Sequence, residues 1–216
     1  MQNNFSLKTT GSRLLLASAL FSGLSSLSAC FPLVATGVAV GALATADRRT
    51  YGAQTDDQAI ELKGSGRLNE SDKRLGGASI TSYNRKVLLT GQVLSEDDKK
   101  LAEQIVARVD NVRSLHNELS VSGRTGFGAA ASDSTITAKV KAALFDTKDV
   151  HANTVKVVTE GSIVYLMGIL TQKEAAKASQ VAAGVSGVSK VVTVIETISE
   201  ADLERIQTRP KEEQKK

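Results

Sequence analysis

Few residues of this chain could carry out acid–base, metal or nucleophilic chemistry. The 216 residues contain one cysteine, Cys30, and two histidines, His116 and His151. A structural zinc site takes four Cys or His ligands, and acid–base catalysis usually relies on positioned histidines or carboxylate pairs. The acidic run at 96–98 is typical of the first turn of a helix, where the helix dipole stabilises negative charge. We therefore expect no enzyme, no metal and no cofactor, and we expect both histidines to be surface residues.

Cys30 is the one residue whose surroundings predict a covalent modification. Two basic residues and an apolar stretch at 14–24 predict a secretory signal peptide over residues 1–29. This stretch is shorter than the ~20 apolar residues of a membrane-spanning helix. Leu27-Ser28-Ala29-Cys30 resembles the lipobox of bacterial lipoproteins, whose cysteine is diacylated, freed by cleavage and N-acylated. The resemblance implies a lipid anchor at Cys30; the alternative is a buried cysteine after a simple signal peptide.

The residues after Cys30 bear on the destination of the chain. Phe31, and not an aspartate, follows the cysteine, and this resembles outer-membrane sorting of lipoproteins in enterobacteria. The apolar residues 31–46 are rich in small side chains and too short for a membrane span. We interpret them as part of a lipid-proximal tether, with a buried packing segment as the alternative. The expected location is the outer membrane, facing the periplasm.

An internal repeat organises the rest of the chain. Residues 84–121 align with residues 161–197. The offset is 77 up to the glycine of each copy and 76 thereafter, because the first copy has one extra residue. The matched pairs include Val87 with Val164, Leu89 with Leu166, Gly91 with Gly168, Ser95 with Thr171, Ala102 with Ala178 and Val109 with Val185.

Each copy has the patterns of an α-β-β-α-β unit. In the second copy, Ile136, Val140 and Leu144 form one apolar helical stripe, and the Ser and Asp residues at 132–134 are good N-cap residues. β-branched runs flank Glu160-Gly161 as in a hairpin, and Thr171-x-x-Glu174 is a capping box that begins the second helix. We expect an α+β fold in which each copy packs two helices on a three-stranded mixed sheet. The first helix of the first copy should be weaker, because it contains Gly64 and Gly66.

The composition and the repeat together predict the domain boundaries. They are a signal peptide at 1–29, a lipidated tether at 30–55, a first domain at 56–121, a flexible linker at 122–131, a second domain at 132–198, and a charged tail at 199–216 that begins with a short helix.

Both copies resemble the BON domain family. The features are a valine-rich strand, a glycine after the second hairpin strand, and Val-x-[Gly/Asn]-Val before the last strand. Two such copies behind a lipobox resemble the dual-BON outer-membrane lipoproteins. Asp47-Arg48-Arg49-Thr50-Tyr51-Gly52-Ala53-Gln54-Thr55-Asp56-Asp57 resembles the D-x-R-[ST]-x-G-x-Q-x-D-D segment before their first domain. A single BON domain has weakly specific motifs, but their ordered combination is specific.

The resemblance implies a binding function and no catalysis. Dual-BON lipoproteins support envelope integrity, bind the anionic phospholipids phosphatidylglycerol and cardiolipin through the first helix of the second domain, and concentrate at the division site. That helix corresponds to Ser134–Phe145 of this chain. Lysines beside a bilayer favour anionic lipid by ~1 kcal/mol each. The residues expected to contact lipid are Thr135, Ile136, Lys139, Lys141, Ala142 and, in the first domain, Tyr83.

Other interpretations of these residues remain open. Without the resemblance, the lysine-bearing face would read as an ordinary solvated helix face, and Tyr83 as an ordinary hairpin tyrosine. In the dual-BON proteins a tryptophan stands where this chain has Thr135, so the interfacial anchor differs here. A protein-binding adaptor for envelope assembly or for control of peptidoglycan hydrolases is the alternative function, with envelope proteins as partners. Aromatic residues make up 4% of the chain and the net charge is +4, so a nucleic-acid partner is not expected.

Overall fold

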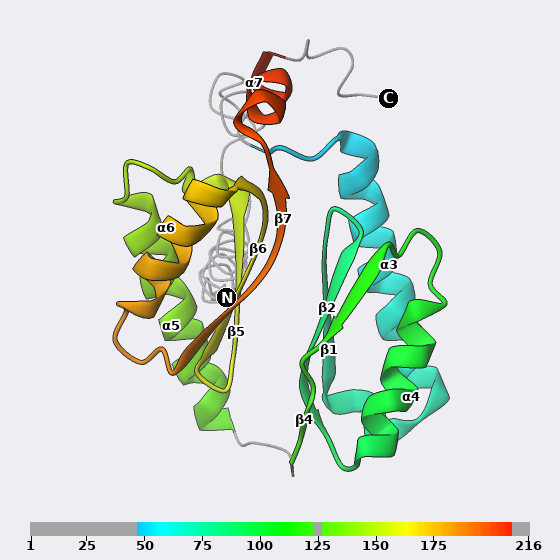
Figure 1. Ribbon diagram of the computed structural model, residues 1–216. Coiled ribbons are helices and arrows are strands. Elements are labelled where there is room, and N and C mark those ends of the chain that lie inside the picture. The colour runs from blue at the N-terminus through cyan, green and yellow to red at the C-terminus, as the bar shows by residue number, and fades with distance from the viewer. Residues whose placement is uncertain (1–46, 123–126, 209–216) are drawn as a thin grey trace, which may run out of the picture. The chain divides into compact units, whose positions relative to one another are not determined.

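The computed structural model describes residues 47–122 and 127–208, and these residues belong to one compact unit. Within it, two α-β-β-α-β domains follow one another along the chain (Figure 1). The expected α+β fold with two mixed sheets is confirmed. The predictions for the signal peptide, for Cys30, for the apolar segment 31–46 and for the end of the tail at 209–216 lie outside the described residues.

Domain 1 runs from the first described helix to β4. Its elements are α3 (Tyr51–Ser71), the 3₁₀ helix η2 (Lys73–Gly77), β1 (Ala78–Tyr83), β2 (Lys86–Val93), α4 (Glu96–Ala107), β3 (Ser114–Asn117) and β4 (Ser120–Val121). The central strand β2 pairs antiparallel with β1 and parallel with both β3 and β4. The last strand is thus interrupted at residues 118–119, where Leu119 turns into the core.

Domain 2 repeats this order with an unbroken last strand. Its elements are α5 (Phe127–Phe145), η3 (Ala152–Thr154), β5 (Val155–Glu160), β6 (Ile163–Thr171), α6 (Gln172–Ala183) and β7 (Lys190–Ile198), followed by the tail helix α7 (Glu200–Thr208). The strand β6 pairs antiparallel with β5 and parallel with β7. The short helix expected at the start of the tail is therefore present as α7.

Three apolar clusters stabilise the fold. One lies between the helices and the sheet of domain 1 and includes Ile60, Leu89 and Val106. The second, in domain 2, includes the predicted stripe Ile136, Val140 and Leu144. The third, here called the interdomain cluster, combines residues of both domains: Tyr83 and Leu88 with Tyr165, Met167, Ile169 and Val194. Each sheet therefore has a helix-covered face, as Figure 1 shows, and a second face that packs in the interdomain cluster.

The family-like Val-x-[Gly/Asn]-Val motif has a backbone reason. Asn111 and Gly187 occupy equivalent positions, and both have the positive φ of left-handed backbone, 68° and 99°. Glycine, and asparagine more readily than other residues, adopts this conformation. The motif therefore marks the turn that ends the second helix and directs the chain into the last strand of each domain.

One expectation about the first helices was wrong, and one found a packing context. The helix of domain 1 is 21 residues long, and Gly64 lies where it packs on β1, since a Cβ at Gly64 would lie 2.6 Å from Ile80 Cδ1. The helix of domain 2 does not begin at 132–134 but at Phe127, inside the expected linker. The alanines at 129–131 favour helix, so the N-cap residues expected there lie within α5.

Candidate functional site

The helix α5 divides into a core side and an outer face. Ile136, Val140 and Leu144 are 4%, 0% and 0% exposed, so they pack on the sheet of domain 2. The Thr137 hydroxyl donates to Thr159 Oγ1 at 2.7 Å and joins the helix to β5. The opposite side of the helix is available to a partner.

This outer face, defined by Ala131, Thr135, Ala138, Ala142 and Phe145, is exposed along its length. These residues recur at helical spacing on one side of α5. The predicted contact residues Lys139 and Lys141 are also exposed and lie on its two flanks. Small side chains between two lysines make a surface that can approach a flat, negatively charged partner closely.

Phe145 was not predicted as a contact residue. Its side chain is 77% exposed at the last position of α5. It lies three residues after Ala142 and ten after Thr135, so helical spacing alone places it on the outer face. An exposed aromatic side chain beside lysines is the type of residue that enters the boundary of a lipid bilayer. The chain thus lacks an aromatic residue at Thr135 but carries one at the other end of the same face.

Two of the expected lipid contacts are buried in the structure. Ile136 is part of the core of domain 2, and Tyr83 is 5% exposed in the interdomain cluster. The Tyr83 hydroxyl donates to the Thr154 carbonyl oxygen at 3.4 Å. The Arg49 guanidinium lies 4.2 Å from the centre of its ring. Neither side chain is accessible to a bilayer in this conformation, so we correct their assignment to interior positions.

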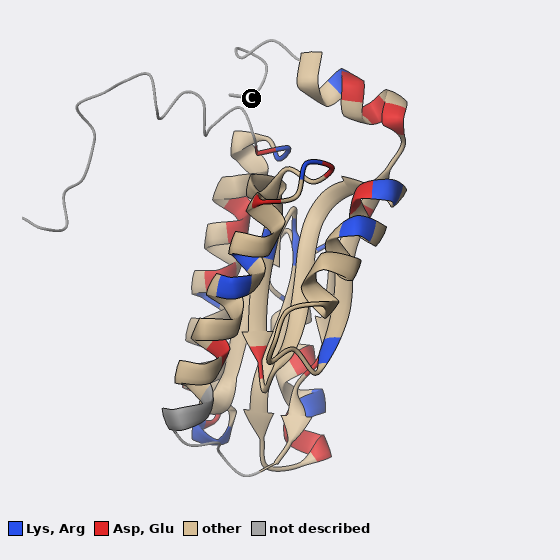
Figure 2. Cartoon of the chain, turned by 90° about the vertical axis from the view of Figure 1, so that its left-hand side faces the viewer, with Lys and Arg blue, Asp and Glu red and all other residues tan. Residues whose placement is uncertain are grey.

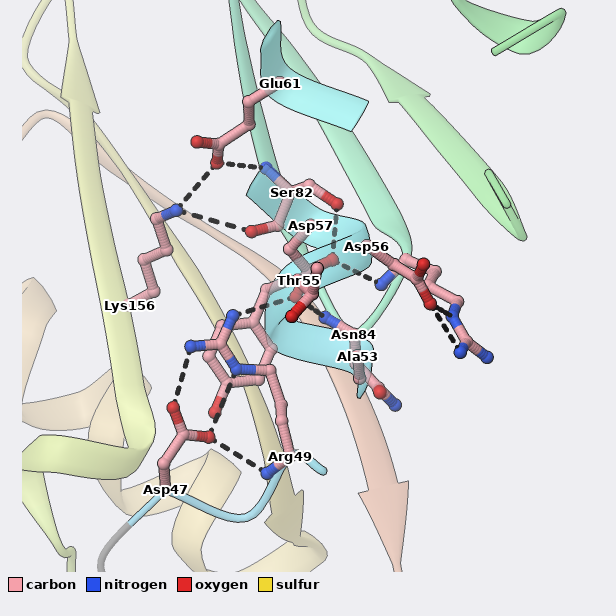
Figure 3. Close-up of polar contacts among 12 residues, drawn as sticks. Asp47, Arg49, Ala53, Thr55, Asp56, Asp57, Glu61, Ser82, Asn84 and Lys156 are labelled. Atoms are coloured by element: carbon pink, nitrogen blue, oxygen red, sulfur yellow. Dashed lines mark hydrogen bonds and ion pairs between the residues drawn. The ribbon is translucent and has the colours of Figure 1, made fainter. Parts of the chain in front are cut away.

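Through Arg49, Tyr83 contacts a polar network at the start of α3. Figure 3 shows Arg49 with its partners Asp47 and Asp57 in this network. Arg49 donates to Asp47 at 2.7 Å and to Asp57 at 2.8 Å. Burial by itself lowers the pKa of Arg49, but its hydrogen bonds with the two carboxylates outweigh this effect and raise the pKa overall. Burial raises the pKa of Tyr83, so near neutral pH its hydroxyl keeps the proton that it donates to the Thr154 carbonyl oxygen.

Asp57 in domain 1 has an equivalent in Asp133 of domain 2. Asp57 accepts hydrogen bonds from the backbone N–H groups of Asn84 and Arg85, at 2.8 and 2.7 Å. Asp133 accepts them from Gly161 and Ser162, at 2.8 and 2.9 Å. Both pairs are the two-residue tip of a β-hairpin, and all four tip residues have positive φ. The predicted N-cap residue Asp133 therefore caps a hairpin and not a helix.

The predicted capping box of α6 is present and has a further partner. Thr171 Oγ1 accepts from the Glu174 backbone N–H, and the Glu174 carboxylate accepts from the Thr171 backbone N–H. Arg48, which precedes domain 1, donates to both oxygens of Glu174 at 2.6 and 2.7 Å. Burial raises the pKa of Glu174, but the bonds from Arg48 and Thr171 outweigh it and lower the pKa overall.

The remaining surface features have less definite chemistry. An open hollow of about 300 Å³ in domain 1 is lined by Lys73, Arg74, Gln92, Leu94 and Ser122.

In the described ranges no group of His, Cys, Asp and Glu could hold a metal ion. No helix between residues 47 and 208, apart from the undescribed linker, is long and apolar enough to cross a membrane. Figure 2, which faces the helices of domain 2, shows basic and acidic residues interspersed along the chain.

The comparisons with protein families and with known proteins agree on one family for this chain. The BON domain model matches twice, at residues 56–123 and 132–198. The outer membrane lipoprotein DolP of Haemophilus influenzae is 38% identical over 171 residues, which cover 78% of this chain and 88% of that protein. A 21 kDa hemolysin of Actinobacillus pleuropneumoniae is 34% identical over 151 residues, which cover 69% of this chain and 78% of that protein.

Solved structures resemble the chain more distantly. The C-terminal domain of CdsD, a structural protein of the type III secretion system of Chlamydia trachomatis, is 16% identical. The match covers 66% of this chain and 67% of that one, with a TM-score of 0.27. We draw no functional conclusion from a similarity at this level.

Proposed function

Because the chain belongs to the BON-domain family, with one BON domain before and one after the linker, we propose that it is an outer-membrane lipoprotein that binds anionic phospholipid through domain 2. Cys30 carries the lipid anchor in this proposal, and the protein faces the periplasm. The name of the Haemophilus influenzae relative, an outer membrane lipoprotein, supports the location. The family resemblance extends the proposal to envelope integrity and to the division site.

The observation that carries the lipid proposal is the outer face of α5. It combines an exposed phenylalanine, four small side chains and two flanking lysines. The lysines attract anionic headgroups, the small residues allow the helix to lie close to the surface, and Phe145 adds apolar area that a bilayer can bury. A single exposed apolar residue is common on protein surfaces, and the support comes from the position of Phe145, which is 77% exposed on the face that the two lysines flank.

The residues of the site act as a binding surface and not as a catalytic centre. His116 and His151 are exposed, and they lie on β3 and directly before η3. The buried carboxylates Asp57, Asp133 and Glu174 each accept hydrogen bonds from backbone N–H groups of their own domain. Their bonding explains their burial without a reaction, and we include no catalytic step in the proposal.

Flotation on lipid vesicles tests the proposal. Residues 31–216, which lack the acylated cysteine, should float with vesicles that contain phosphatidylglycerol and not with vesicles of phosphatidylcholine alone. Added salt should reduce the floated fraction, because exposed charges are screened beyond ~10 Å at 0.1 M salt. Equal flotation on both kinds of vesicle, or none on either, would contradict binding to anionic lipid. Retention of envelope proteins from detergent extract without vesicle binding would favour the adaptor.

A further inference from the structure

The segment that enters domain 1 is bound by both domains. This entry segment, Asp47–Thr50, comes directly before α3, whose N-cap is Thr50. Arg48 is 7% exposed and donates to Glu174 and to the Ile169 carbonyl oxygen, both in domain 2. Arg49, the next residue, turns to domain 1. The two adjacent arginines thus bind different domains: Arg48 binds domain 2 and Arg49 binds domain 1.

The contact of Arg49 places the same segment against the domain boundary. Its guanidinium pairs with Asp57 of α3 and stacks on Tyr83, while Asp47 fixes its orientation from below in Figure 3. Tyr83 in turn donates to the Thr154 carbonyl oxygen of domain 2. The entry segment therefore contacts the interdomain cluster, through the stacking of Arg49 on Tyr83.

The apolar contact between the domains is one-sided. Of the buried members of the interdomain cluster, domain 1 supplies Tyr83 and Leu88, and domain 2 supplies the other four. Partly buried apolar side chains that pack against the cluster also come from the second half of the chain: Val158, Ile163, Val192, Ile198 and Ile206. Polar pairs cross between the domains as well, since Lys156 donates to Glu61 at 2.9 Å and Asn84 donates to Glu196 at 2.8 Å. Both pairs are partly exposed, and such pairs contribute little. Two domains joined in this manner are expected to move relative to each other unless something else holds them.

We propose that the entry segment is an interdomain clasp, in which the Arg48–Glu174 pair keeps the sheets of the two domains together. The pair is suited to this role because it is bidentate, buried and formed between residues 126 positions apart. It also uses a carboxylate already fixed by the capping box of α6, so its geometry is set before Arg48 binds. If Cys30 carries the lipid anchor of the proposed function, the segment that controls the domain arrangement is the one nearest the membrane in the chain.

The chain contains a matched contact that does not join domains. Arg74 forms an ion pair with Asp98 at 3.1 Å, and Asp98 is the third residue of α4, whose carboxylate accepts from the Ser95 hydroxyl. An arginine therefore pairs with the third residue of the second helix in both domains: Arg74 from within domain 1, and Arg48 across the domain boundary. Arg74→Met is therefore a control that removes an equivalent charge without touching the clasp.

Distance measurement between spin labels tests the clasp. Cys30 is the only cysteine, so residues 30–216 with Cys30→Ser accept labels at Leu62→Cys on α3 and Gln180→Cys on α6, both exposed. The parent protein should give one narrow distance distribution. Arg48→Met should add a broad, longer component, with the open fraction raised about tenfold or more, as expected for loss of a charged hydrogen-bonded pair.

Three variants make the outcome decisive. Glu174→Gln keeps a capping residue but loses the charge for Arg48, and it should broaden the distribution even if Arg48→Met folds poorly. Thr171→Ala weakens the cap and leaves the pair, and it should keep the narrow distribution, as should Arg74→Met. Unchanged distances in both Arg48→Met and Glu174→Gln would overturn the proposal, and so would equal broadening in Arg74→Met.

Discussion

Asp57 and Asp133 stand 76 positions apart and make the same contact in the two domains, since each carboxylate receives two consecutive backbone N–H groups from the tip of its own β-hairpin. The tips adopt left-handed backbone at Asn84, Arg85 and Ser162 as well as at Gly161. Left-handed backbone is unfavourable for residues with a side chain. The aspartates therefore stabilise turns that the tip residues alone would not favour.

Removal of these carboxylates should destabilise the domains unequally. Asp133→Ala should lower the free energy of unfolding by ~2 kcal/mol, because two backbone groups lose their acceptor. Asp57→Ala should cost more, since Asp57 also accepts from the Ser82 hydroxyl and pairs with Arg49. Urea unfolding followed by circular dichroism measures both. Asp146→Ala, at an exposed position, should change stability by less than ~0.5 kcal/mol. An equal effect of all three variants would be inconsistent with hairpin capping.

The outer face of α5 should lose lipid affinity when its end residue or its charge is changed. Phe145→Ala should weaken binding to phosphatidylglycerol vesicles about 3- to 10-fold, because less apolar area enters the bilayer. Lys139→Glu should weaken it about tenfold or more and reduce its dependence on salt. Flotation at low salt measures both. Leu62→Ala is the matched control, since Leu62 is also 77% exposed but lies on α3 of domain 1. If Leu62→Ala reduced the affinity for these vesicles as much as Phe145→Ala, lipid binding could no longer be assigned to domain 2.

An aromatic residue at position 135 should tighten the same contact. Thr135 is exposed and its hydroxyl donates only to the Ala131 carbonyl oxygen of the preceding turn. Thr135→Trp therefore adds an interfacial side chain without entering the core stripe. Affinity for anionic vesicles should rise and the melting temperature should stay close to that of the parent. A stable variant with unchanged affinity at low salt would count against this helix as the membrane-contacting surface.

The Arg48–Glu174 pair should make stability depend on pH in acid. The pKa of Glu174 is lowered in the folded protein, so its contribution is present above the ordinary value of about 4.3 and is lost as the pH falls through the folded value. Arg48→Met should reduce the free energy of unfolding by ~3 kcal/mol at about pH 7. The difference from the parent should shrink in acid, as the pH falls through this lowered pKa and Glu174 becomes protonated. Urea unfolding over a series of pH values from neutral into acid checks this, and a difference that does not change with pH would exclude the carboxylate as its source.

Lipidation at Cys30 has a direct test. Cys30→Ala should leave an unprocessed precursor that takes up no labelled fatty acid, because the thiol that accepts the lipid is absent. Metabolic labelling and the mobility of the protein on gels measure the two effects. Cys30→Ala protein that is still acylated and fractionates with membranes as before would refute the anchor.

The sequence was sufficient for the parts of the fold that depend on local patterns. Its repeat gave the order of elements, and Thr171-x-x-Glu174 marked the true start of α6. Positions that depend on contacts between distant segments were not predictable in this way. Tyr83 reads like any hairpin tyrosine until Arg49 and Thr154 are placed beside it. Phe145 could have been found from helical spacing alone, because it follows the predicted contact Ala142 by three residues in the same helix.

The central strand of domain 2 serves two cores at once. Val164, Leu166 and Leu170 face the helices, while Tyr165, Met167 and Ile169 face the interdomain cluster. Because side chains alternate along a strand, a shift of one residue in pairing would exchange the two sets. Both sets are apolar, so burial alone penalises such a slip weakly. Two positions disfavour the slip. At Gly168, the Cβ of any other residue would lie 2.7 Å from the Thr154 carbonyl oxygen, and Thr171 must stay in place as the N-cap of α6. Correct pairing of β6 during folding therefore rests on Gly168 and Thr171, and not on the apolar residues of the strand.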